Sequence, residues 1–226
     1  MYEKVFKRVF DLVLSLTAFI ILLPLILILT VVGAVTMKGN PFFLQPRPGK
    51  DERIFNLIKF RSMTNEKDMS GNLLSDDVRL VPWGKFLRHT SLDELPSLIN
   101  IISGDLAIVG PRPQLVRDMV FMTPEQRRRH SIRQGLTGLA QVNGRNSISW
   151  EKKLSYDIKY IEDGITLKND LKIIFMTVLQ VLKPDEVDAE GMATAEDFGD
   201  YLLRTGAVSK SEYDKKQSEA KELLGV

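Results

Sequence analysis

The chain of 226 residues contains no cysteine and only two histidines. Without cysteine it forms no disulfide bond and offers no thiolate to a metal ion. The histidines, His89 and His130, are far apart in the sequence, which argues against a zinc site. Internal repeats and low-complexity tracts are also absent, and the length suits one domain with a sizeable core.

Charge is missing from one long segment, because residues 12–37 include no Asp, Glu, Lys or Arg. As a straight helix this segment would reach about 39 Å, more than the roughly 30 Å hydrocarbon core of a bilayer. The segment is therefore competent to enter a membrane. A cleaved secretory signal is a poor interpretation, because the apolar run is too long and no small-residue cleavage site follows it.

A single spanning helix is the ordinary interpretation of such a run, but two features favour a bent one. Basic residues flank the run on both sides, so a spanning helix would violate the positive-inside rule at one end. Pro24 lies near the middle, where it removes a backbone hydrogen bond and favours a kink. We therefore predict a re-entrant helix-break-helix, bent at Pro24, with both ends in the cytoplasm. The flanking basic residues are Lys4, Lys7, Arg8, Lys38, Arg47, Lys50 and Arg53.

Charge is also unevenly divided, because the formal net charge of +2 combines a basic body with an acidic tail. Residues 184–226 hold 11 acidic and 5 basic side chains, a net of −6, which leaves +8 on residues 1–183. A basic body suits an anionic partner such as a nucleotide, a nucleic acid or lipid headgroups, and the charge alone does not indicate which of them binds. Residues 127–130 (RRRH) look like a nucleic-acid patch, but they lack interleaved aromatics. We expect membrane lipids and no nucleic acid as partners.

Local patterns predict an α+β body that is mainly helical. Residues 41–49 indicate a loop or an edge strand. In residues 53–61 apolar and polar side chains alternate as in a strand, which puts Lys59 and Arg61 on one face. Residues 68–77 indicate an exposed loop. Residues 134–146 contain three glycines and suggest another loop. Helices are expected at 92–102, ended by Gly104, at 124–129 with Thr123 as cap, at 149–161, and at 171–182 capped by Asn169 and Asp170. The last is apolar enough for the core or the membrane interface.

Asp93 and Glu94 are adjacent carboxylates at a predicted helix start. Ser91 and Glu94 fit a capping box, which alone explains the pair structurally. Pro96 conflicts with that cap, because it would break an early hydrogen bond, so the helix would begin nearer Asp93. In either register the pair lies where backbone amides and the helix dipole also attract phosphate and metal-bound phosphate.

Arg112 is held between Pro111 and Pro113, and a rigid guanidinium suits bidentate contact with phosphate. A solvated Pro-Arg-Pro turn is the structural alternative. Lys59, Arg88 and Arg145 are further phosphate candidates, although each by itself is typical of a surface cation.

Together these motifs resemble the bacterial sugar transferase family, the monotopic polyprenyl-phosphate phosphoglycosyl transferases. The resemblance covers about residues 2–182, and residues 1–8 look particularly like the small enzymes that begin N-linked protein glycosylation with diacetylbacillosamine phosphate. It rests on residues 59–63 (KFRSM), 90–96 (TSLDELP), 104–113 (GDLAIVGPRP), 134–145 (QGLTGLAQVNGR), Asp157 and 170–173 (DLKI).

The resemblance implies that Asp93 attacks the β-phosphate of a UDP-sugar, releases UMP and passes the phosphosugar to polyprenyl (undecaprenyl) phosphate. Mg²⁺ would be the cofactor, held by Asp93 and Glu94. Arg112 would contact the nucleotide, and the other implied substrate-binding residues are Lys59, Arg88, Arg145 and Asp157. The enzyme would act at the bacterial cytoplasmic membrane, with its catalytic domain in the cytoplasm.

On this interpretation residues 1–38 form the membrane anchor, residues 39–183 the catalytic domain, and residues 184–226 an acidic extension of unknown role. Two other functions stay open: a membrane glycosyltransferase that releases UDP, and a non-catalytic membrane scaffold in which Asp93 and Glu94 only cap a helix. The sequence predicts neither the sugar nor the oligomeric state. UDP-diacetylbacillosamine is the first guess, ahead of other UDP-N-acetylated deoxysugars and UDP-galactose.

Overall fold

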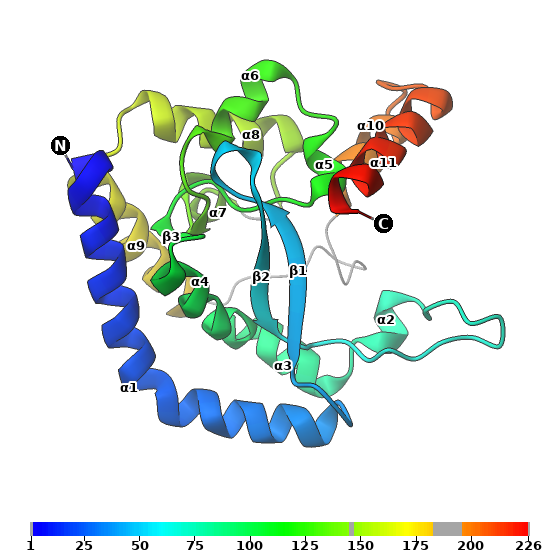
Figure 1. Cartoon of the computed structure of the whole chain (residues 1–226), viewed down its shortest axis with the longest axis horizontal. Helices are drawn as coiled ribbons and strands as arrows, with labels where there is room; N and C mark the ends of the chain where they lie inside the picture. Colours follow the sequence, from blue (N-terminus) through cyan, green and yellow to red (C-terminus); the bar gives the residue numbers. More distant parts are fainter. Residues whose placement is uncertain (1, 145–146, 183–195, 226) are drawn as a thin grey trace.

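The structure, a computed structural model, describes residues 2–144, 147–182 and 196–225, and it is mainly helical, as predicted (Figure 1). The longer helices of the described residues are α1 (Lys7–Thr36), α3 (Pro82–His89), α8 (Trp150–Glu162), α9 (Leu167–Leu182) and α11 (Lys210–Leu224). Shorter ones are α2 (Asp76–Arg79), α4 (Leu98–Ser103), α5 (Val116–Met119), α6 (Pro124–Arg127), α7 (Leu139–Val142) and α10 (Phe198–Arg204). A π-helix η1 (Tyr2–Phe6) and the 3₁₀ helices η2 (Lys50–Glu52), η3 (Leu92–Ser97) and η4 (Arg128–Ser131) complete them. The strands are β1 (Phe42–Pro48), β2 (Ile54–Phe60), β3 (Ala107–Val109) and β4 (Gly135–Thr137).

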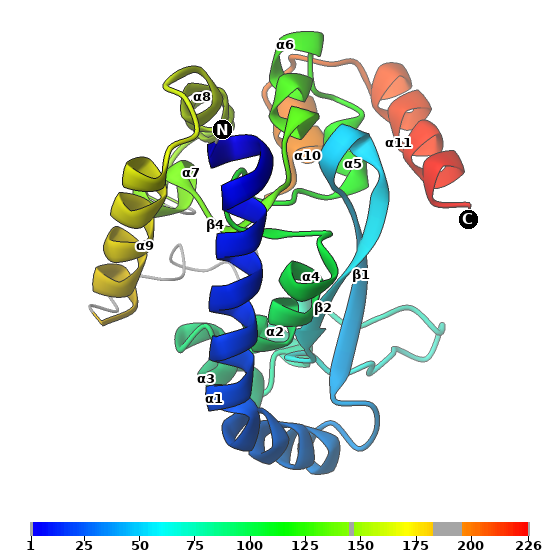
Figure 2. The same cartoon turned by 60° about the vertical axis from the view of Figure 1, so that its left-hand side comes forward.

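Helix α1 carries Pro24 in its interior and turns sharply near its middle (Figures 1 and 2). The predicted break is wrong in one respect, because helical structure continues through the proline and the helix bends without interruption. Among the described residues, α1 is the one helix long and apolar enough to cross a membrane, and only 17% of its most apolar window is buried. A core helix of a soluble protein would bury most of that surface.

Both ends of α1 contact the body. At its start, the Arg8 guanidinium donates to the carbonyl oxygens of Ile101 and Ile102, at 2.5 and 2.8 Å, where α4 ends. Beyond the bend, Leu29 packs into a core cluster with Phe60 of β2 and Leu87 of α3. The helix therefore leaves the body and returns to it.

Asp170 anchors the N-terminal segment, and the prediction that it caps a helix is wrong. Helix α9 begins earlier, at Leu167, because the Thr166 hydroxyl accepts a hydrogen bond from the Asn169 amide and caps the helix instead. The fully buried Asp170 carboxylate accepts from Lys7 Nζ at 2.6 Å. It also accepts from the hydroxyls of Tyr2, at 2.8 Å, and Tyr160, at 2.6 Å.

The β1–β2 hairpin is antiparallel, with Phe42 opposite Phe60 and Pro48 opposite Ile54. The predicted strand at β2 is confirmed, and residues 42–48 form an edge strand, where proline is tolerated. On the other edge of β2, the Asn100 side chain accepts from the Ile58 amide and donates to the Asn56 carbonyl, both at 2.9 Å. The Asn100 side chain thus takes the hydrogen-bonding place of a third strand beside β2. It also fixes α4 against β2.

The segment 92–102 is not one helix, because η3 precedes α4. Pro96 has no N–H to donate, so the chain takes the tighter 3₁₀ path before α4 begins. The capping-box interpretation is wrong: Ser91 has a left-handed φ of 55°, and its side chain makes no cap hydrogen bond. Gly104 ends α4 with a φ of 97°, as predicted.

Residues 134–146 contain more order than the predicted loop, since β4 and α7 lie within them. Strand β4 pairs in parallel with β3, with Ala107 opposite Gly135. A Cβ on Gly135 would lie 2.1 Å from the Gly110 amide nitrogen, so this close crossing requires glycine. The crossing fixes the loop that follows β3 and carries Arg112.

The described part of the acidic extension, residues 196–225, packs on the body beside α5 (Figure 1). The rings of Phe198 and Trp150 lie 5.0 Å apart. Asp118 on α5 accepts a hydrogen bond from the Phe198 amide at 2.8 Å. The predicted cap at Thr123 is confirmed, and Ser149, where a helix was predicted to begin, caps α8.

Candidate active site

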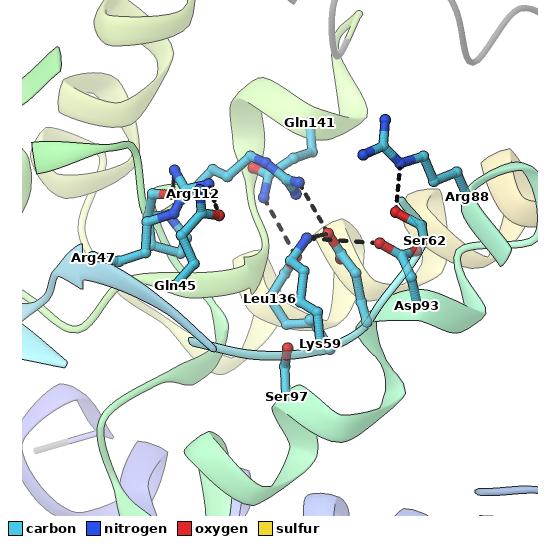
Figure 3. Close-up of polar contacts among 12 residues, drawn as sticks. Gln45, Arg47, Lys59, Ser62, Arg88, Asp93, Ser97, Arg112, Leu136 and Gln141 are labelled. Carbon is cyan, nitrogen blue, oxygen red and sulfur yellow. Dashed lines mark hydrogen bonds and ion pairs between the residues drawn. The ribbon is translucent and has the colours of Figure 1, made fainter. Parts of the chain in front are cut away.

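Three segments that are distant in the sequence converge on one cluster (Figure 3). Lys59 lies near the end of β2, Asp93 and Glu94 in η3, and Arg112 in the loop after β3. Lys59 Nζ lies 2.7 Å from Glu94 Oε1 and 3.9 Å from Asp93 Oδ2. Arg112 Nη2 lies 2.9 Å from the same Glu94 oxygen. Four of the residues singled out in the sequence are thus neighbours.

The hydrogen bonds between β2 and η3 explain why these side chains meet. Ser97, at the end of η3, donates from its hydroxyl to the Ile58 carbonyl at 2.7 Å. This contact and the Asn100 contacts hold η3 alongside β2. Lys59 therefore faces the carboxylates of η3, the helix whose Ser97 side chain is hydrogen-bonded to the backbone of β2.

Glu94 is the fixed anion of the pair. Its Oε1 accepts hydrogen bonds from both Lys59 and Arg112. Burial alone would raise the pKa of the Glu94 carboxyl, but these two cations outweigh burial and lower it below its ordinary value. Glu94 is therefore ionised and held in place.

Asp93 is less restrained. Its side chain is 14% exposed, and no other residue in the described part of the chain makes a hydrogen bond to its carboxylate. Burial raises its pKa above the ordinary range, Lys59 lowers it, and the neighbouring Glu94 charge raises it again. A carboxylate with a raised pKa that forms only a long ion pair with Lys59, at 3.9 Å, and accepts no hydrogen bond from the described residues suits the role of a nucleophile.

Arg88 lies on the Asp93 side of the cluster, as Figure 3 shows. Its Nε donates to the Ser62 hydroxyl at 3.0 Å, and its charge contributes to lowering the Asp93 pKa. The structure thus brings Arg88 to the site. Arg145 lies outside the described residues.

Asp157 is placed elsewhere. Its carboxylate is buried and lies 2.7 Å from Arg129 Nη2. The same Arg129 nitrogen donates to the main-chain carbonyl of Arg112 at 2.5 Å. Asp157 is therefore a partner of Arg129, which holds the Arg112 backbone, and it makes no contact with the carboxylate pair.

The carboxylate pair suits a metal ion that binds together with a substrate. Among the described residues no group of three or more His, Asp or Glu side chains forms a metal site. Mg²⁺ commonly binds through one or two carboxylates plus substrate phosphates. Asp93 and Glu94 supply that number, and the surrounding cations suit the phosphates.

Sequence reasoning missed Arg47. A shallow, partly open pocket lies beside the cluster, and Arg47 contributes to its wall. The lining residues are Arg47, Leu57, Lys59, Glu94, Ser97, Leu106, Arg112, Pro113, Gly135 and Leu136. The signal was available, because Arg47 stands between Pro46 and Pro48 as Arg112 stands between Pro111 and Pro113.

The bacterial sugar transferase family matches residues 2–184, which is most of the chain. The chain belongs to this family. The predicted class of enzyme, a phosphoglycosyl transferase, agrees with this membership and with the names of several relatives. The family match ends before the described part of the extension, so α10 and α11 are additions to the family core.

Three relatives illustrate the range of the family. "Uncharacterized sugar transferase EpsL" of Bacillus subtilis is 45% identical over 86% of this chain and 96% of its own length. "UDP-glucose:undecaprenyl-phosphate glucose-1-phosphate transferase" of Klebsiella pneumoniae is 39% identical over 79% of this chain and 40% of its own length. "Undecaprenyl-phosphate galactose phosphotransferase" of Salmonella typhimurium is 34% identical over 81% of this chain and 42% of its own length. The chain thus spans about two fifths of the longer relatives and nearly all of the shorter one.

Proposed function

We propose that this chain transfers a phosphosugar from a UDP-sugar to undecaprenyl phosphate and releases UMP. An Asp93 oxygen attacks the β-phosphorus, and the bond from that phosphorus to the bridging oxygen breaks, so that UMP leaves with the oxygen. A phosphate oxygen of the carrier then attacks the same phosphorus and breaks its bond to Asp93. A covalent intermediate divides one difficult displacement into two easier ones.

The observation that carries the proposal is that the two adjacent carboxylates have different contacts. Glu94 is locked by Lys59 and Arg112, whereas Asp93 lies beside the same cations without a hydrogen bond from any described residue. A helix cap would require neither the neighbouring cations nor the raised Asp93 pKa. The arrangement therefore favours catalysis over the scaffold alternative.

Repulsion between an anionic nucleophile and a diphosphate is the main obstacle to this reaction. Lys59, Arg88 and Arg112 surround the carboxylates and offset that repulsion. A Mg²⁺ ion held by Asp93 and Glu94 would add further positive charge at the phosphates.

The path of α1 supports a re-entrant anchor. Arg8 binds the end of α4, and Leu29 packs against Leu87 beyond the bend, so both halves of α1 contact one body. A straight spanning helix would place one of these contacts across a hydrocarbon core of about 30 Å. The bend instead lets the helix dip into one leaflet, with the catalytic domain on the cytoplasmic side.

Helix α9 supplies a second membrane-facing surface. Its exposed stripe comprises Leu167, Leu171, Phe175 and Val178, at helical spacing. A helix of this kind lies in the headgroup region with its apolar face in the acyl chains. This position holds Asp93 near a carrier whose phosphate cannot leave the bilayer.

The identity of the donor sugar and of the released nucleotide is tested by a product screen. Purified enzyme in lipid nanodiscs is given undecaprenyl phosphate, Mg²⁺ and one UDP-sugar at a time, and the released nucleotide is identified. UDP-diacetylbacillosamine, UDP-glucose and UDP-galactose are the first donors, the last two because relatives are named for glucose and galactose. Release of UMP with one donor is expected, and it should stop when EDTA removes the metal. Release of UDP instead would establish the glycosyltransferase alternative.

A further inference from the structure

Arg47 is a half-buried cation whose hydrogen-bond partners are neutral. Its Nη1 donates to the Pro113 carbonyl at 3.0 Å, and its Nη2 donates to Gln45 Oε1 at 2.6 Å. Its Nε is buried and, within the described residues, has no hydrogen-bond partner. Arg112 lies in the same pocket, so two guanidinium groups share one wall.

The charges of Asp118, Asp197 and Glu94 raise the pKa of Arg47, but none of the three carboxylates is its hydrogen-bond partner among the described residues, and Glu94 is bonded to Lys59 and Arg112. Asp118 accepts hydrogen bonds from the amides of Leu115 and Phe198, and Asp197 pairs with Arg117 at 3.1 Å. Burial and the charge of Arg112 lower the pKa of Arg47 to about 10. A neutral side chain could donate to the same two carbonyl oxygens at a smaller desolvation cost. The charge of Arg47, with an Nε that has no partner among the described residues, is therefore suited to an anion that binds in the pocket.

The position of Arg47 indicates which anion. Figure 3 shows Arg47 on the opposite side of the Lys59–Glu94 pair from Asp93. In phosphoryl transfer the attacking and leaving oxygens lie roughly in line through the phosphorus. A donor whose β-phosphorus faces Asp93 directs its leaving phosphate away from Asp93, toward the two arginines.

We propose that Arg47 and Arg112 together form the subsite for the α-phosphate of the nucleotide, the phosphate that leaves as UMP. The inference rests on the proposed function and adds a residue to its site. The two Pro-Arg-Pro segments, 46–48 and 111–113, restrict the backbone at both arginines, and the Pro113 carbonyl links them by accepting the Arg47 hydrogen bond. Rigid cations bind a phosphate at a lower entropic cost than flexible ones.

The test compares UMP with uridine as ligands of the full-length enzyme in nanodiscs, by calorimetry. Arg47→Gln should weaken UMP binding by about tenfold or more, because a charge-assisted hydrogen bond is lost, and should leave uridine binding unchanged. Arg47→Lys should restore part of the UMP affinity. Arg53→Gln, which changes an exposed arginine next to the same hairpin, is the matched control and should bind UMP like wild type.

Three results would overturn the inference. Arg47→Gln with wild-type UMP affinity would show that Arg47 does not contact the nucleotide phosphate. Equal losses for UMP and uridine would show a purely structural role. A raised KM for undecaprenyl phosphate with unchanged UMP binding would assign Arg47 to the carrier. If wild-type enzyme releases UDP, the proposed function itself fails, and that outcome is separate from all three.

Discussion

The Asp157 carboxylate is buried against the fully buried guanidinium of Arg129, with 2.7 Å between their atoms. Arg129 in turn donates to the Arg112 carbonyl, so Asp157 indirectly helps to hold the backbone of the candidate site at Arg112. Replacing Asp157 with Asn leaves the Arg129 charge buried without a counter-ion. The loss of one partner of such a pair costs about 3–5 kcal/mol. We expect Asp157→Asn to lower the free energy of unfolding by about this amount in a denaturant titration.

The control for this variant is Asp163→Asn. Asp163 pairs with Lys159 at 3.1 Å on the surface, where about half of each side chain is exposed. Such pairs contribute about 1 kcal/mol or less. Equal losses for the two variants would contradict the role of Asp157 as the buried counter-ion.

The pH dependence of the reaction should follow Asp93. Only ionised Asp93 attacks phosphorus, and burial raises its pKa, so kcat/KM should fall as the pH drops through that raised value. Lys59 lowers the Asp93 pKa, so Lys59→Met should shift the acidic limb of the profile to higher pH. Lys85→Met, at an exposed position, is the control. A limb at unchanged or lower pH in Lys59→Met would argue against Asp93 as the titrating group.

The sequence indicated which residues converge on the candidate site better than it predicted how the backbone brings them together. Asp93, Glu94 and Arg112 stood out because short motifs join charge with proline or a helix start. Asp157 and Asp170 look the same in sequence as residues that line a pocket, and only tertiary packing reveals that each serves a buried partner. Whether a carboxylate faces solvent or a buried cation depends on contacts far away in the chain.

Backbone detail was predictable where local rules act alone. Pro24 predicted the turn in α1, and Ser149 the start of α8. The register at η3 was not predictable, because the β2 backbone and the Lys59 charge override the capping box. The docking of the extension depends on Phe198 meeting Trp150, which no local pattern indicates.

The anchor is tested by single cysteines, and the chain has none of its own to remove. Glu3→Cys and Gly39→Cys place thiols at exposed positions on the two sides of α1, and a Cβ at Gly39 meets no atom closer than 4.0 Å. A re-entrant helix leaves both thiols in the cytoplasm. An impermeant maleimide should therefore label neither in intact cells and both after permeabilisation. Labelling of one alone in intact cells would establish a spanning helix.

The extension should stabilise the body through Phe198, which is 4% exposed and packs with Met122, Trp150 and Leu154. Phe198→Ala leaves a cavity there and should lower the free energy of unfolding of the docked extension by about 3–5 kcal/mol. Limited proteolysis should then cleave the extension faster than in wild type. Leu223→Ala, at a position 48% exposed, should leave the cleavage rate unchanged. Equal rates for Phe198→Ala and wild type would show that the extension is not held by this contact.

The central claim, a phosphosugar bound to Asp93, is tested by giving the enzyme a UDP-sugar labelled at the β-phosphorus while undecaprenyl phosphate is withheld. Wild-type protein should retain the label after denaturation, with one UMP released per labelled chain, and should lose it when the carrier is added. Asp93→Asn should retain none, and Glu94 variants should retain little. A wild-type polypeptide that releases UMP on addition of carrier, yet never carries the label, would contradict the account.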